Sequence, residues 1–169
     1  GGDGGDPQAV FMLGTSSGGF MTMRFACQSG ERLRAAASVN ATLPVSLSQN
    51  CRPAKALSWM FLNGTSDYIV PFKGKARPAW MSAGVSFDYF ADRAGCSKSA
   101  TLAPAKAVVR AGTWVERRTR AGCSTGSSST QYSNAAAVSS VMPSRKLGAL
   151  PAPAMSSAPP SGTTSAASM

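Results

Sequence analysis

The segment "VFMLGTSSGGFMTMRFACQSG", residues 10–30, constrains the fold more than any other part of the chain. A short apolar run, residues 9–13, is expected to form a strand that is buried on both faces. A turn of small residues follows it, and apolar residues then recur at helical spacing over residues 17–29. Gly30 is expected to end that helix. A strand, a tight turn and a helix in this order predict an α/β fold with a mostly parallel sheet.

The rest of the chain extends this pattern and then loses it. Residues 33–39 and 57–62 are expected to be strands, and residues 107–109 and 113–117 to form a hairpin. An amphipathic helix is expected within residues 78–94, and its buried side comprises Trp80, Met81, Val85, Phe87, Phe90 and Ala91. From about residue 135, Ala, Ser, Pro and Thr dominate and periodicity disappears. Such a composition buries too little apolar surface to offset the entropy of ordering. We therefore predict a folded domain over residues 1–134 and a disordered tail over residues 135–169.

Charge and residue counts exclude several classes of protein. The formal net charge is +10, yet the basic residues are scattered and only seven residues are acidic. No zinc-finger or RNA-binding motif accompanies the charge, so we expect an exposed basic surface and no nucleic-acid partner. No stretch is long and apolar enough to span a membrane. The chain has no histidine, and no cysteine pair has the C-x-x-C spacing of a metal site, so we expect neither metal nor cofactor.

Four cysteines, Cys27, Cys51, Cys96 and Cys123, are widely spaced along the chain. An even number at such spacing is typical of disulfides formed in an oxidising compartment. Four buried free thiols are the alternative that the spacing leaves open.

The turn "GTSSG" at residues 14–18 matches the pattern G-x-S-x-G. In a nucleophile elbow this pattern raises a serine above the sheet and directs the next backbone N–H at a developing oxyanion. The pattern makes Ser16 the candidate nucleophile and the Ser17 N–H the candidate oxyanion donor. A purely structural turn is one alternative; a phosphate-binding loop is another, but no Gly-Lys-Ser/Thr follows.

Asp67 is the second candidate, because it follows the apolar strand expected at residues 57–62. Open α/β sheets place functional groups at the carboxyl ends of their strands. The order serine then acid agrees with α/β-hydrolases. An ordinary turn aspartate is the alternative.

Four blocks, "GTSSGGFMTMRFAC", "NGTSDYIVPFKG", "RAGCSKSAT" and "AGCSTG", resemble the polyhydroxybutyrate depolymerase / feruloyl esterase group of secreted α/β-hydrolases. Their order and rough spacing agree over about residues 4–132. The resemblance implies Ser16 as nucleophile, Asp67 as acid, and the disulfides Cys27–Cys51 and Cys96–Cys123. It also implies a secreted, monomeric protein that acts on polyester or on feruloyl and acetyl esters of plant polysaccharide.

The chain departs from that family in ways that bear on activity. The family has upstream strands, a loop with a second oxyanion donor, and a catalytic histidine before a Trp-Pro. Met142-Pro143 corresponds to the Trp-Pro, which puts Ser139 or Ser140 where the histidine belongs. We therefore expect a truncated esterase-like chain, or the product of a shifted reading frame, with almost no activity. A catalytically dead ester-binding or polysaccharide-binding protein and a non-functional truncated product are the alternatives.

Overall fold

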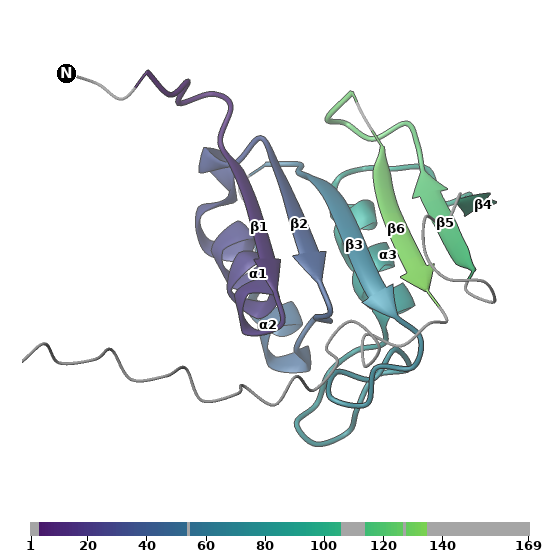
Figure 1. Cartoon of the computed structure of the whole chain (residues 1–169). Coiled ribbons are helices and arrows are strands. Elements are labelled where there is room, and N and C mark those ends of the chain that lie inside the picture. The colour runs from purple at the N-terminus through teal and green to yellow at the C-terminus, as the bar shows by residue number, and fades with distance from the viewer. Residues whose placement is uncertain (1–3, 54, 106–113, 127, 135–169) are drawn as a thin grey trace, which may run out of the picture.

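The sheet order shows how the chain builds its α/β fold. The computed structural model describes residues 4–53, 55–105, 114–126 and 128–134. The strands are β1 (Phe11–Thr15), β2 (Ala35–Val39), β3 (Ser58–Gly64), β4 (Thr101–Ala105), β5 (Val115–Arg120) and β6 (Ser129–Asn134). The helices are α1 (Ser17–Ser29), α2 (Val45–Asn50) and α3 (Ala83–Arg93), with a 3-10 turn η1 at Gly30–Arg32. The strands form one sheet in the order β1-β2-β3-β6-β5-β4 (Figure 1). β1, β2, β3 and β6 are parallel to one another, whereas the pairs β6–β5 and β5–β4 are antiparallel. This mostly parallel sheet confirms the predicted α/β class.

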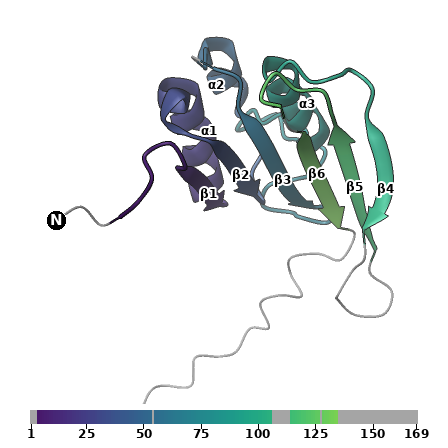
Figure 2. The same cartoon turned by 90° about the horizontal axis from the view of Figure 1, so that it is seen from above.

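All three α-helices of the described residues lie on the same face of the sheet (Figure 2). Aromatic rings of β3 and α3 form the centre of the core on that face. The Trp59 and Phe90 ring centroids are 4.2 Å apart, and those of Phe61 and Phe90 are 6.0 Å apart. Aromatic residues contribute large buried areas, so these contacts account for much of the attachment of α3 to the sheet.

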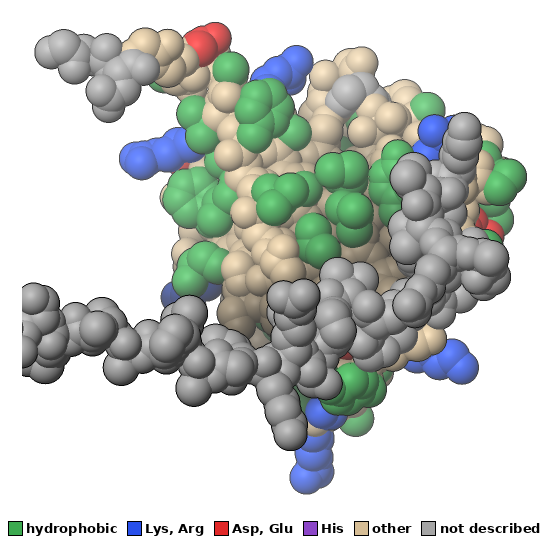
Figure 3. All heavy atoms as spheres, in the orientation of Figure 1, with side chains coloured by type: hydrophobic (Ala, Val, Ile, Leu, Met, Phe, Trp, Pro, Cys, Tyr) green, Lys and Arg blue, Asp and Glu red, His purple; other side chains and the backbone are tan. Residues whose placement is uncertain are grey.

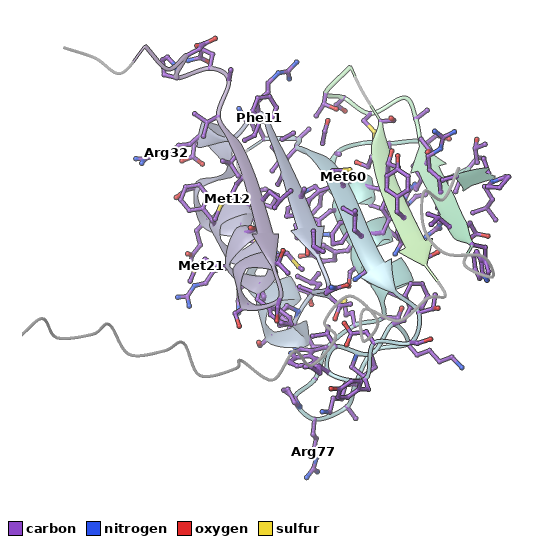
Figure 4. All side chains as sticks on the ribbon, viewed as in Figure 1. Phe11, Met12, Met21, Arg32, Met60 and Arg77 are labelled. Carbon is purple, nitrogen blue, oxygen red and sulfur yellow. A yellow bond between two sulfur atoms is a disulfide. The ribbon has the colours of Figure 1, made fainter. Side chains whose placement is uncertain are left out.

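The opposite face of β1 is exposed, so the prediction that residues 9–13 are buried on both faces is wrong. The side chains of Phe11 and Leu13 are 68% and 65% exposed. Hydrophobic side chains gather on this side of the sheet in Figure 3, and Figure 4 labels Phe11 and Met60 among them. The physical reason is that no described helix covers this side. β1 is also an edge strand of the described sheet.

Several element boundaries differ from the prediction. The helix over Ser17–Ser29 is confirmed with Gly30 as its C-cap, although Gly30 has a right-handed φ of −61° and begins η1. β5 pairs with β4 and β6, whereas residues 107–109, its expected hairpin partner, lie outside the described residues. Val85, expected on the buried side of its helix, is 52% exposed. The tail predicted over residues 135–169 also lies outside the described residues.

The two disulfides implied by the family resemblance are confirmed. Cys27 bonds to Cys51 with an S–S distance of 2.01 Å, and Cys96 bonds to Cys123 at 2.02 Å. The first joins the last turn of α1 to the residue that ends α2. By the loop-entropy estimate, each closure stabilises the fold by about 3–4 kcal/mol.

A buried arginine attaches β5 to α3. Arg120 is 2% exposed and its guanidinium donates to Asp92 Oδ1 at 2.6 Å, Asp88 Oδ1 at 3.2 Å and the Ser97 carbonyl at 2.6 Å. Lys98 contacts the other carboxylate oxygen of Asp92 at 2.8 Å. A hydrogen bond from Lys98, opposed by partial burial and supported by Arg120, lowers the pKa of Asp92 below its ordinary value of 3.8.

Because the folded-state pKa of Asp92 is lowered, its contribution to stability is present above about pH 3.8 and is lost as the pH falls further. We expect Asp92→Asn to lower the free energy of unfolding at pH 6. The difference from the wild type should shrink as the pH falls below 3.8. Denaturant unfolding between pH 2.5 and 6 measures this, and a difference that grows with acidity would contradict the assignment.

Candidate active site

The parallel strands bring the two predicted site segments to the same edge of the sheet. The Ser16 N–H donates to the Val39 carbonyl at 2.9 Å, and the Asn40 N–H donates to the Leu62 carbonyl at 2.8 Å. These bonds extend the strand ladder past the ends of β1 and β2. Ser16 follows β1 directly, and Asp67 lies three residues after Gly64, the last residue of β3. Since neighbouring strands are about 5 Å apart, β1 and β3 are separated by about 10 Å at this edge.

Ser16 has the strained backbone that a nucleophile elbow requires. Its φ is 52° and its ψ is −117°, a conformation that residues with a Cβ rarely adopt. Its carbonyl accepts the first bond of α1, from the Phe20 N–H at 3.1 Å. The side chain is exposed, and its hydroxyl forms no hydrogen bond with any described residue. The hydroxyl is therefore accessible, and no described residue acts on it as a base.

Glycines around Ser16 allow the helix to approach the strands closely. A Cβ added at Gly14 would overlap the carbonyl group of Gly18. A Cβ added at Gly19 would lie 2.7 Å from the Ala41 Cβ and 2.9 Å from the Ser38 Oγ. Gly18 itself has open space in the direction of a Cβ. Packing therefore requires glycine at positions 14 and 19, whereas at position 18 it leaves room for a Cβ.

The Ser17 N–H lies at the first position of α1. Backbone N–H groups in the first turn of a helix have no intrahelical acceptor, and the helix dipole makes this end partly positive. Both properties suit an oxyanion donor. The role of the Ser17 N–H stays a prediction.

Asp67 is held by its own turn. Its Oδ1 accepts hydrogen bonds from the backbone N–H groups of Ile69 and Val70, both at 2.9 Å. Its backbone N–H donates to the Gly64 carbonyl at 3.3 Å. These bonds orient the carboxylate at the carboxyl end of β3, as a triad acid requires, and a turn aspartate makes similar bonds. The assignment of Asp67 as the acid stays a prediction.

The loop that follows Asp67 contacts the start of α1, a link that the sequence analysis missed. The ring centroids of Trp80 and Phe20 are 5.1 Å apart. The Trp80 N–H donates to the Lys75 carbonyl at 2.8 Å, and the Lys75 N–H donates to the Trp80 carbonyl at 3.0 Å. Trp80 was expected on the buried side of a helix, but it precedes α3, which begins at Ala83. Its isolated aromatic ring beside Gly74 and Pro78 was the available signal for a loop.

A general base is the missing part of the arrangement. The full sequence contains no histidine. The ammonium group of Lys75 lies 5.8 Å from the centroid of the Trp80 ring and forms no hydrogen bond with Ser16. The positions aligned with the catalytic histidine, Ser139 and Ser140, lie outside the described residues. Within the part of the chain that the structure describes, no group of His, Cys, Asp or Glu residues is arranged to hold a metal ion.

Alanine substitutions at Gly14 and Gly18 distinguish the effect of close packing on stability from the effect of helix propensity. Gly14→Ala should lower the free energy of unfolding by about 3 kcal/mol or more, because its Cβ meets backbone atoms that cannot move aside. Gly18→Ala is the matched control and should change it by less than about 1 kcal/mol, because open space surrounds that Cβ. Equal effects of the two substitutions in denaturant unfolding would rule out the close contact between Gly14 and Gly18.

Backbone strain at Ser16 can be measured separately. Relief of a strained φ,ψ pair is worth about 1–3 kcal/mol, and a new glycine loses about 0.5–1 kcal/mol through unfolded-state entropy. Ser16→Gly should therefore be about 1 kcal/mol more stable than the wild type. Ser16→Ala keeps the Cβ and should stay within about 0.5 kcal/mol of the wild type. A Ser16→Gly variant that is less stable than Ser16→Ala would show that this residue is unstrained.

Comparison with known proteins adds no relative to this picture. No family model matches the chain, and no curated protein matches it. No helix in the described residues is long and apolar enough to cross a membrane.

Proposed function

We propose that this chain is a serine carboxylic-ester hydrolase in architecture, with Ser16 as nucleophile, Asp67 as acid and the Ser17 N–H as oxyanion donor. The main support is the strained backbone of Ser16, with φ 52° and ψ −117°, between a parallel strand and a helix. A strained non-glycine residue at this position has no evident packing role. Backbone strain of this kind accumulates at functional sites.

The absence of a base determines how much activity we propose. A serine hydroxyl needs a neighbouring base to become an efficient nucleophile near neutral pH. Loss of the base lowers turnover by a factor on the order of 10⁶, which takes a typical turnover of about 10 s⁻¹ to about 10⁻⁵ s⁻¹. The chain is therefore a nearly inactive member of the esterase class. A binding protein that keeps the ester site is the second candidate, favoured by the unpartnered Ser16 hydroxyl.

The substrate class and the compartment are proposed on the family resemblance. The substrates are short polyesters, or feruloyl and acetyl esters of plant polysaccharide. Two disulfides are compatible with an extracellular protein. Secretion and a monomeric state are part of the proposal.

A reactive-serine probe tests the proposed nucleophile directly. We expect a fluorophosphonate to label the full chain slowly at Ser16, and Ser16→Ala to abolish the label. The turnover number for p-nitrophenyl butyrate should be about 10⁻⁵ s⁻¹. Turnover above about 0.1 s⁻¹ that vanishes in Ser16→Ala would contradict the absence of a base. A folded chain that never labels would favour the binding protein.

The alignment of the missing base has its own test. Ser139→His and Ser140→His each restore an imidazole at a position aligned with the family histidine. A rate increase in one of them that depends on Asp67 would support the alignment. No increase in either would count against it.

A further inference from the structure

A groove of about 470 Å³ runs between α1 and α2 and begins beside the proposed nucleophile. Its α1 wall is formed by Ser17, Phe20, Met21, Arg24 and Gln28. These residues recur at a spacing of three or four, so they form one stripe along the helix. Ser17 is the residue after Ser16. One end of the groove therefore lies beside the proposed site, and the groove runs from there along α1.

The groove changes character along its length. Near the site its walls are mostly apolar, with Phe20 and Met21 on α1 and Leu47 on α2, beside the hydroxyl-bearing Ser17 and Ser46. Toward the other end of α1 they are polar, with Arg24, Gln28 and Asn50. Figure 4 labels Met21 on α1. A ligand that fits this gradient has an apolar chain next to the site and a polar group at the far end.

The charge at the far end is positive and unneutralised. Arg24 forms no ion pair with any described residue, and none of the described residues that line the groove is acidic. A guanidinium group binds a carboxylate through two parallel hydrogen bonds, which a neutral ester cannot match. The amide groups of Gln28 and Asn50 supply further donors.

The walls of the groove are held in place on both sides. The Cys27–Cys51 disulfide joins the last turn of α1 to the end of α2. The contact between Phe20 and Trp80 fixes the near end to the loop that follows Asp67. A groove with fixed walls loses little entropy when it binds a ligand.

We propose that this groove binds the aliphatic chain of an ester that ends in a carboxylate, and that Arg24 binds that carboxylate. The inference rests on the proposed function, because it places the ester group at Ser16. Arg24 lies seven positions after Ser17, which is about 10 Å along the helix and matches a chain of roughly six to eight carbons.

Binding of two matched ligands tests the inference without requiring turnover. Monomethyl suberate carries one carboxylate, and dimethyl suberate is its neutral counterpart. In titrations of the ¹⁵N-labelled full chain, monomethyl suberate should bind at least about tenfold more tightly. The amide shifts should centre on Ser17, Phe20 and Arg24. Equal affinity for the two ligands, or shifts confined to other surfaces, would overturn the inference.

Two arginine variants separate a specific site from attraction to a basic protein. Arg24→Met should abolish the preference for monomethyl suberate. Arg117→Met removes the same charge from an exposed position on β5 and should keep the preference. Equal losses in both variants would overturn the role of Arg24.

Fluorophosphonate labelling distinguishes failure of this inference from failure of the proposed function. If Ser16 is labelled but no preference for the carboxylate is found, the groove inference is wrong and the proposed nucleophile stands. If Arg24-dependent binding is found but Ser16 is never labelled, the groove is a binding site and the hydrolase proposal is wrong.

Discussion

The close approach of α1 to the first two strands is the constraint on which the site depends. Gly14 and Gly19 leave no room for a Cβ, so the start of the helix lies directly against β1 and β2. Ser16, in the short connection between β1 and α1, has a positive φ of 52°. Ser16 is thus strained and exposed directly beside the contact between α1 and the strands.

The parallel ladder supplies the second half of the arrangement. The four parallel strands end at the same end of the sheet, so the segments that follow β1 and β3 both start there, with only β2 between them. The loop after β3 returns to α1 through Trp80 and Phe20, which couples the Asp67 segment to the Ser16 segment. β6 also runs parallel to β3, and its last residue, Asn134, pairs with Gly64 at this end of the sheet. The fold thus places the Ser16 and Asp67 segments at the same end of the sheet.

The candidate site has an exposed serine and an oriented carboxylate, but the chain has no histidine to act between them. Ser16 is exposed and strained, Asp67 is oriented by two backbone N–H groups, and the helix start is partly positive. None of these features removes a proton from the serine. An oriented carboxylate acts on a serine through an imidazole, and the sequence has none. What we propose for this surface is therefore binding: the groove between α1 and α2 would bind a ligand with a negatively charged end at Arg24.

The sequence by itself determined the local elements: the helix Ser17–Ser29, the apolar strands before the turn and before Asp67, and the α/β class. Periodicity and turn chemistry act over a few residues, so they are readable without the fold. The tertiary structure alone decided which strands pair, that β4 and β6 belong to the sheet, and that Phe11 and Leu13 face solvent. It also decided that Trp80 contacts Phe20. Apolar composition shows that a side chain can be buried, whereas its burial depends on whether another element covers it.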